Sequence, residues 1–480
     1  MPLAETIKPA PRAGMAVPIA IAAAIALLHV LTNGRYGFHR DEFQFLSDAR
    51  HLDWGFVAYP PLTPILEHVS LALFGVSLVG LRLFSVLAQA AAALAVALSP
   101  LPLFEGTEFQ YSSFDYLWWL LAAWFIIRLL KTENPRWWLA IGAALGLGLQ
   151  TKYSIVFFIA GILGALLLTR ARRYFLNGWF YAGVAVALII FLPNFLWLTR
   201  HNFISYDFLQ HIHTRDVRIG RADGFLRDQF LICVNLFAAP LWILGLIAYL
   251  RDRRYRPLAW MYLIPLALFF FAKGRGYYVA PAYPMLLAMG AVAAEPWLAR
   301  LRPSLRRTIE ATFFTSLAVC GLYICAIIVP LASSGPLRAF ALARNGDLRE
   351  ELGWDTMLQT IAQVRDSLPA AQQANLGIVV GNYGENGAIE ILGPAYHLPA
   401  AISGTNSAWL RSYPQSQPTT LIVVGDDDRD SQFTSCKLAA HIPYPKNQNN
   451  EESNDHSEIY ICGPPRLSWP ELWKIALSYG

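Results

Sequence analysis

The residue types best suited to chemistry gather in one short polar stretch, Tyr36-Gly-Phe-His-Arg-Asp-Glu-Phe43. Asp41 and Glu42 are adjacent carboxylates, and His39 and Arg40 stand directly before them. An aspartate in this setting could act as a general base on an acceptor hydroxyl, while its neighbour orients it or holds a metal ion. The alternative interpretation is a solvated loop of mixed charge.

A second carboxylate, Asp115, begins an apolar run after the Ser-rich segment 105–114. It could serve the same site, or it could be an ordinary first-turn acid that the helix dipole favours. Lys152, Lys273 and Arg275 lie in very short polar turns between apolar runs. Such cations would bind a phosphate group, or their side chains could reach lipid headgroups at the membrane surface.

The composition indicates that these residues sit on a membrane protein. Of 480 residues, 55% are hydrophobic and only 15% are charged, where a soluble chain has about 25% charged residues. A membrane-spanning helix needs about 20 apolar residues, and we expect spans near 14–31, 80–98, 115–130, 137–150, 155–169, 179–198, 226–250, 257–272, 277–297 and 308–331. Several of these segments are short, so they must tilt or lie buried within the bundle.

Four basic stretches separate these spans and orient them. They contain Arg128, Lys131 and Arg136; Arg170, Arg172 and Arg173; Arg251, Arg253, Arg254 and Arg256; and Arg300, Arg302, Arg306 and Arg307. Short basic loops stay in the cytoplasm, so we expect 99–114, 151–154, 199–225, 273–276 and the tail from about 332 to lie outside. Counting from the N-terminus places 32–62 outside as well. The two counts agree only if one more crossing lies between 62 and 98, where Leu62–Val79 is a poor span because it contains Glu67 and His68.

The tail differs in kind from the body. From residue 332 it has 10 Lys and Arg against 16 Asp and Glu, whereas the first 331 residues have 28 against 17. No basic face accumulates in the polar part, so we expect no nucleic acid partner. Helical patterns at 338–352 and 355–368 and apolar runs at 377–380 and 420–424 predict a small α/β domain, with a flexible loop at 446–457. In an oxidising compartment Cys436 and Cys462 would form a disulfide.

These motifs resemble a known family. The His-Arg-Asp-Glu loop with Tyr59-Pro-Pro, the later Asp115, and Gly148-Leu-Gln-Thr-Lys-Tyr resemble the GT-C glycosyltransferases that use polyprenyl-phosphate sugars, of the protein O-mannosyltransferase and aminoarabinose-transferase type (family 39/83). Lys273–Tyr278, Asn382-Tyr-Gly-Glu385 and Ser403-Gly-Thr-Asn-Ser407 resemble bacterial members of family 39. The resemblance covers nearly the whole chain.

The resemblance implies a mainly α polytopic membrane protein with about 10–12 transmembrane helices and an extracytoplasmic α/β domain. The division would be 1–331, with the catalytic loop at 32–62, and 332–480. It implies inverting transfer of a sugar from undecaprenyl or related polyprenyl phosphate to lipid A, another lipid, a glycan or a protein hydroxyl, on the periplasmic side of a bacterial inner membrane. Besides the donor and the acceptor, the protein would contact membrane lipids.

The same resemblance suggests the role of each site residue. Asp41 matches the family's loop aspartate, with Glu42 beside it, and Asp115 matches the second acid. The lipid phosphate would contact the basic groups Arg40, Lys152, Lys273 and Arg275, with Tyr59 nearby. Metal dependence stays open: Glu42 with His39, or with His211 and His213, could bind a divalent ion, but no spacing fixes one.

The chain also departs from the family pattern. The residue before the paired prolines is Tyr59 rather than Lys, and Arg82 to Pro100 leaves room for one helix where relatives have two. Two alternatives therefore remain: a transporter or flippase of a lipid-linked sugar, and an inactive relative that lacks a helix. Transporters carry their ionisable residues near the midplane and often show a repeat, whereas these acids lie in loops at one face.

Overall fold

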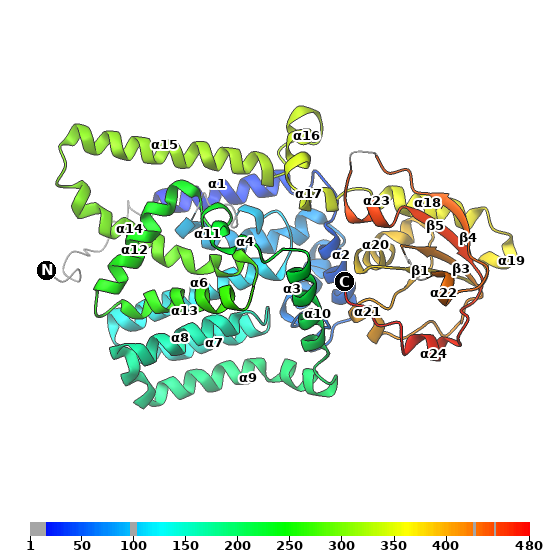
Figure 1. Ribbon diagram of the computed structural model, residues 1–480, viewed down its shortest axis with the longest axis horizontal. Coiled ribbons are helices and arrows are strands. Elements are labelled where there is room, and N and C mark those ends of the chain that lie inside the picture. Colours follow the sequence, from blue (N-terminus) through cyan, green and yellow to red (C-terminus); the bar gives the residue numbers. More distant parts are fainter. Residues whose placement is uncertain (1–15, 97–102, 426–428, 446–447) are drawn as a thin grey trace.

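The computed structural model describes residues 16–96, 103–425, 429–445 and 448–480, without the side chains of 91–96. Its first two thirds form a bundle of helices (Figure 1). The α-helices of the bundle are α1 (Ala16–Thr32), α2 (Arg40–Arg50), α3 (Leu62–Phe74), α4 (Leu78–Val96), α6 (Tyr111–Thr132), α7 (Trp137–Leu149), α8 (Ile155–Leu168), α9 (Gly178–Arg200), α10 (Ile204–Arg218), α11 (Phe225–Leu231), α12 (Ala239–Arg251), α13 (Arg256–Phe271), α14 (Tyr283–Leu298) and α15 (Pro303–Ile328). Three 3₁₀ segments, η3 (Arg170–Leu176), η4 (Leu236–Ala238) and η5 (Gly276–Ala282), join some of them.

The bundle has two chemically different ends. The four basic stretches lie together at the end far from the C-terminal domain, which we call the basic end (Figure 1). Two contacts tie neighbouring stretches there: the Arg254 Nε donates to the Leu130 carbonyl at 2.7 Å, and Arg173 pairs with Glu133 at 3.1 Å. The opposite end, which we call the domain end, faces the tail. The grouping that the charge count predicted is therefore present in the fold.

Several helices are long and apolar enough to cross a membrane. Within the described residues four pass by length and composition: α6, α9, Gly276–Leu298 and α15. Two bent pairs, Ile155–Leu168 with Arg170–Leu176 and Phe225–Leu231 with Leu236–Arg251, raise the number to six. Five further apolar helices have 10–17 residues, so several of the predicted spans are present as helices shorter than an isolated span would be.

Glycine pairs let neighbouring helices pack closely. A methyl group at Gly142 of α7 would lie 2.0 Å from the carbonyl oxygen of Gly183 in α9, and one at Gly290 of α14 would lie 1.9 Å from that of Leu241 in α12. No side chain fits in either place. Close approach over small residues is how helices gain contact in lipid, where burial of apolar surface contributes little.

The segment Leu62–Val79, which the loop count offered as an extra crossing, does not cross the bundle. The Leu62 N–H donates to the Gln150 carbonyl at 2.9 Å, and His68 Nδ1 lies 2.8 Å from the Ala49 carbonyl, so α3 packs against α2 at the domain end. The chain enters α4 at the domain end and has returned there by Gly106, whose carbonyl accepts from Asn33. The 62–110 segment therefore begins and ends on one side, and α3 is not the missing crossing. The prediction that only one helix fits between residues 82 and 100 agrees with α4, although 97–102 lie outside the described residues.

The tail forms a five-stranded mixed sheet covered by helices. The strand order is β2-β1-β3-β5-β4, with β1 (Leu376–Val380) parallel to β2 (Ala401–Ile402) and β3 (Thr420–Val424), and β5 (Glu458–Cys462) antiparallel to β3 and β4 (Lys437–His441). Its helices are α16 (Gly335–Arg344), α17 (Asp347–Glu350), α18 (Trp354–Asp366), α19 (Ala370–Gln373), α20 (Tyr383–Leu392), α21 (Ser407–Leu410), α22 (Arg429–Gln432), α23 (Glu451–Asp455) and α24 (Trp469–Trp473), with η6 (Gly393–Tyr396). The predicted 446–457 loop was wrong in part, because 451–455 form α23, which an Asn450 capping box begins. Cys436 and Cys462 form a disulfide.

Helix α2 joins the tail to the bundle. Its Phe43 packs with Trp354 of α18 and Ala388 of α20 in one core cluster. A methyl group at Gly387 would lie 2.3 Å from the Phe43 carbonyl oxygen, so α20 lies directly on α2. The predicted catalytic loop at 32–62 thus contains an 11-residue helix, α2, held between the two parts of the molecule.

Candidate active site

Asp41 stands in the first turn of α2, at the contact between the bundle and the tail. The preceding His39 caps the helix. Its ring Nδ1 accepts from the Asp41 backbone N–H at 3.2 Å, and the His39 backbone N–H donates to the Glu42 carboxylate. One oxygen of Asp41 accepts a 2.7 Å hydrogen bond from the Tyr383 hydroxyl, and the other faces the Gln110 amide at 3.5 Å. The carboxylate is half-buried, so it is held in place yet still accessible.

Glu42 is fully engaged in structure. Both of its oxygens accept from the Arg82 guanidinium, at 2.7 and 2.8 Å, and they also accept from the N–H groups of Phe109 and His39, each at 2.8 Å. Neither Glu42 nor Arg82 is exposed. With four donors on two oxygens, Glu42 fixes α2 against the 105–110 segment and has no free oxygen for a reacting group.

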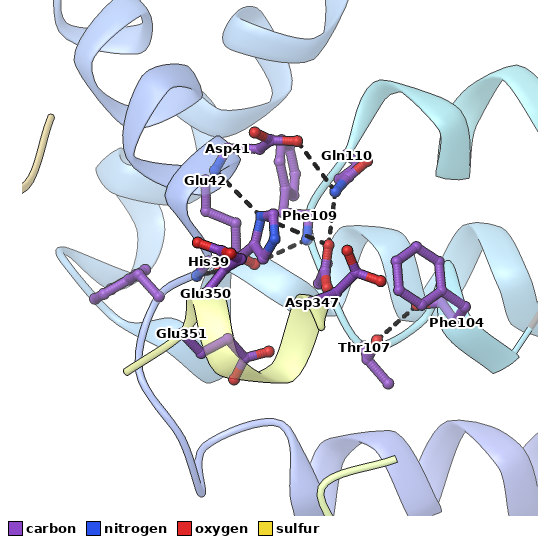
Figure 2. A network of polar contacts seen from close by, with 12 residues as sticks. His39, Asp41, Glu42, Phe104, Thr107, Phe109, Gln110, Asp347, Glu350 and Glu351 are labelled. Atoms are coloured by element: carbon purple, nitrogen blue, oxygen red, sulfur yellow. Dashed lines mark hydrogen bonds and ion pairs between the residues drawn. The ribbon is translucent and has the colours of Figure 1, made fainter. Parts of the chain in front are cut away.

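More carboxylates lie around Glu42, among them Glu350 and Glu351 (Figure 2). Glu351 lies 3.3 Å from Arg82, and Glu108 lies 3.8 Å from the His39 ring. Burial raises the pKa of Glu351 to about 8 against the opposing charge of Arg82, and burial raises the pKa of Glu108 well above its usual range. Arg82 alone therefore neutralises a cluster in which not every acid is ionised at neutral pH.

Lys152 lies in a cage of aromatic rings. Its Nζ is 4.8 Å from the ring centre of Tyr111, 4.6 Å from that of Tyr278 and 5.5 Å from that of Tyr277. Tyr111 directly follows Gln110, the residue that faces Asp41. Lys152 and Asp41 thus contact neighbouring residues of the chain, Tyr111 and Gln110. The electron-rich faces of the three tyrosine rings attract the partly buried ammonium group.

Two acids lie on the bundle side of Lys152. Asp115 is one helical turn beyond Tyr111 on the same face of α6, is 5% exposed, and accepts from the Trp119 indole at 3.2 Å. Glu105 accepts from Ser112 at 2.6 Å, and burial raises its pKa to about 6. Both interact electrostatically with Lys152. Asp115 is therefore a neighbour of the cation rather than of Asp41.

The other predicted cations differ from one another. Arg275 pairs with Asp216 of α10 at 2.6 Å and lies 3.4 Å from the Tyr277 hydroxyl, which is part of the Lys152 cage. Lys273 is exposed, and no contact joins it to the cage in the described part of the chain. The structure therefore brings Arg275 to the site and leaves Lys273 at its periphery.

Arg40 and Tyr59 are engaged elsewhere. Arg40 forms a bidentate pair with Glu451 of α23 and lies 4.7 Å from the ring centre of Tyr383. The Tyr59 hydroxyl donates to Asp48, and its ring is 3% exposed. Each of these two side chains therefore binds a partner within the protein, Glu451 or Asp48.

The sequence interpretation missed several residues of this site. Arg82 and Gln110 were given no role, and Tyr383, Tyr277 and Tyr278 stood only inside motifs that carry the resemblance, without a role of their own. A further signal was present in advance: Asn382 and Glu385 have capping-box spacing, and Asn382 does begin α20 this way, which places Tyr383 at the first helical position.

The metal site considered for this loop does not fit its residues. Among the described residues no group of three or more His, Cys, Asp and Glu side chains could hold a metal ion. Glu42 has no free oxygen to contribute, as its hydrogen bonds show. His211 faces Tyr479, with ring centres 5.6 Å apart.

Three comparisons place the chain among known proteins. A family model described as dolichyl-phosphate-mannose-protein mannosyltransferase matches residues 88–197. The lipid A galacturonosyltransferase RgtD of Rhizobium johnstonii is 28% identical over 251 residues, which cover 47% of this chain and 53% of that protein. The chain thus matches about half the length of this curated relative.

The solved structures agree over a longer stretch. ArnT from Cupriavidus metallidurans in the apo state superposes with a TM-score of 0.52 and 14% identity, over 94% of this chain and 98% of ArnT. The structure of ArnT bound to undecaprenyl phosphate gives a TM-score of 0.50, over 95% of this chain and 99% of ArnT. At this identity the likeness shows the fold. The predicted resemblance and fold class are confirmed: the chain is a GT-C-fold membrane protein with a small C-terminal sheet domain, similar to sugar transferases.

Proposed function

We propose that the protein is a membrane glycosyltransferase that moves a sugar from a polyprenyl-phosphate carrier to a hydroxyl of a cell-envelope acceptor. The observation that carries this is that an accessible carboxylate, Asp41, and a caged cation, Lys152, contact two residues that are adjacent in the chain, Gln110 and Tyr111. The names of the relatives support the reaction class. Lipid A is the first acceptor to test, because RgtD is named for it.

The reaction assigns one task to each side of the site. Asp41 accepts the proton of the acceptor hydroxyl as its oxygen attacks the anomeric carbon. The bond between that carbon and the phosphate oxygen breaks, and the carrier leaves as a phosphate monoester. Attack on the side opposite the phosphate inverts the anomeric carbon. Tyr383 orients Asp41 by its 2.7 Å hydrogen bond.

The cationic side receives the leaving phosphate. Lys152, with Arg275 near the same tyrosines, stabilises the charge that develops there. Asp115 and Glu105 balance the charge of Lys152 before the donor binds. The described residues offer no metal cluster for this role, and we assign it to the two cations.

The location follows from the same arrangement. We place the domain end, with the site and the tail 332–480, on the periplasmic side of a bacterial inner membrane, and the basic end of 1–331 in the cytoplasm, in accord with the distribution of Lys and Arg. The Cys436–Cys462 disulfide supports this side, since disulfides persist in oxidising compartments.

The test is transfer of labelled sugar from a panel of polyprenyl-phosphate donors by the purified protein in detergent. Asp41→Asn should abolish turnover while donor binding is retained. Asp53→Asn is the matched control: it lies in the same segment, but its carboxylate bonds Trp54 and Trp197 instead. Binding without turnover by the unchanged protein would favour a transporter or an inactive relative. An equal loss of turnover in both variants would contradict the role of Asp41 as the general base.

A further inference from the structure

The basic end contains an open cavity that the proposed transfer reaction does not use. It has a volume of about 320 Å³ and lies between the α8–η3 turn and the α12–α13 turn. Its lining consists of Leu167, Leu168, Thr169, Arg170, Arg172, Arg253 and Arg256. Four of these seven side chains are guanidinium groups from two turns far apart in the sequence, so the fold has gathered positive charge in one hollow.

No acid of the described chain pairs with these four arginines. Other basic residues at this end do have partners: Arg173 pairs with Glu133, and Arg306 pairs with Glu310. The nearest acid in sequence, Asp252, has one carboxylate oxygen occupied by the N–H groups of Arg254 and Tyr255, at 2.8 and 3.2 Å. Like charges in one cavity repel each other, and an anion would relieve this repulsion and take up the unused donors.

The rim of the cavity is apolar. Leu167 is 63% exposed and Leu168 is 59% exposed, and both end the apolar helix α8. Leu176, on the following 3₁₀ segment, is 92% exposed. A small free anion would gain nothing from these leucines, whereas a lipid could place its phosphate among the guanidinium groups and its acyl chain along α8.

We propose that this cavity binds the phosphate headgroup of an anionic glycerophospholipid at the cytoplasmic membrane surface. Basic pockets between transmembrane helices on this side are suited to such headgroups, and guanidinium groups bind phosphate in bidentate fashion. The proposal does not depend on the transfer reaction, because the cavity and the active site lie at opposite ends of the bundle (Figure 1).

The experiment uses the full chain in a zwitterionic detergent. Phosphatidylglycerol is titrated, and bound lipid is counted by native mass spectrometry while thermal melting is followed. Phosphatidylcholine and inorganic phosphate are titrated beside it. We expect phosphatidylglycerol to bind and to raise the melting temperature, while phosphatidylcholine and inorganic phosphate leave it unchanged. Equal stabilisation by inorganic phosphate or by phosphatidylcholine would overturn the proposal.

Variants test the position. Arg170→Gln, Arg172→Gln, Arg253→Gln and Arg256→Gln together should weaken phosphatidylglycerol binding at least tenfold. Replacing Arg300, Arg302, Arg306 and Arg307 by Gln removes the same charge from the same end and should leave binding unchanged. Equal loss in both sets would mean general attraction to a basic surface, against the proposal. If the first set does not fold, the double variant Arg172→Gln/Arg253→Gln takes its place, with Arg302→Gln/Arg307→Gln as its control.

Discussion

The Tyr383 hydroxyl of the C-terminal domain donates a 2.7 Å hydrogen bond to Asp41 in the first turn of α2. A residue 342 positions away in the chain thus holds the carboxylate that we propose as the base. The Arg40 guanidinium lies over the same Tyr383 ring and pairs with Glu451, so three contacts from the tail meet within one helical turn. The tail therefore does not merely cover the site: it completes the surroundings of Asp41.

Tyr383→Phe should lower kcat about tenfold and leave the KM for the donor unchanged. A hydrogen bond to a charged group is worth about 1.5–3 kcal/mol, and its loss lets the carboxylate rotate away from the acceptor. Steady-state kinetics with a fixed acceptor concentration would measure this. Tyr396→Phe is the control, because it removes a Tyr–Asp hydrogen bond, to Asp355, on the exposed side of the same domain. A fall in melting temperature with unchanged kcat would show that Tyr383 only fastens the tail.

Arg82→Met should destabilise the protein severely, by about 3–5 kcal/mol, because Glu42 and Glu351 would remain buried without their cation. Thermal inactivation in detergent measures the effect. Adding Glu42→Gln and Glu351→Gln to Arg82→Met should recover part of the loss, since the buried charges are then removed together. Arg306→Gln, which breaks an exposed pair with Glu310, should cost no more than about 0.5 kcal/mol. A mild effect of Arg82→Met would contradict a charge-neutralising role.

The sequence predicted the fold better than it predicted the site, and the reason is physical. Apolar runs and basic turns are local signals, so the helices and the two ends of the bundle could be inferred from spacing alone. The strands at 376–380 and 420–424 were found for the same reason. Partners across the chain have no local signal: nothing near Glu42 reveals that Arg82 binds both of its oxygens.

The same distinction applies to individual site residues. Arg40 and Tyr59 were predicted to contact the donor because they are polar residues near Asp41, and the structure gives each an internal partner, Glu451 and Asp48. Lys152 was singled out because a cation in an external turn is unusual, and the fold does place it among three tyrosines. An exception to a general rule was more informative than proximity in sequence.

Lys152→Met should raise the KM or Kd for the polyprenyl-phosphate donor roughly 10- to 100-fold, because a charge-assisted contact to phosphate is worth about 1.5–3 kcal/mol. Lys273→Met is the control: it removes the same group from an exposed position outside the cage, and we expect less than a threefold change. Donor binding measured by fluorescence or calorimetry separates affinity from turnover. Equal effects of the two substitutions would mean that overall positive charge, not the cage, attracts the donor.

Removing the Cys436–Cys462 disulfide should lower the stability of the tail by about 3 kcal/mol, since the bridge closes a loop between residues 26 positions apart. The double variant Cys436→Ser/Cys462→Ser should be cut faster by protease within the tail, while the bundle stays intact. In cells, both thiols should be blocked to alkylating reagents until a reductant is added. Free thiols in cells would contradict the periplasmic location that we propose for the tail.

The pH dependence of stability should report the contact between His456 and Glu385. His456 Nδ1 lies 2.7 Å from Glu385 Oε1. Burial lowers the pKa of His456, but the Glu385 charge outweighs burial and the pKa rises to about 9, against 6.5 in the unfolded chain. Because the folded value is the higher one, this contact contributes fully to stability below about pH 6.5, and the contribution disappears as the pH rises through about 9. The melting temperature of the unchanged protein should therefore fall between pH 6 and pH 10, and that of His456→Gln should fall much less. His441→Gln is the control: this exposed histidine lies 3.7 Å from Glu458, and its replacement should leave the fall in melting temperature as large as in the unchanged protein. Identical pH profiles for the unchanged protein and His456→Gln would show that the pair is not ionised.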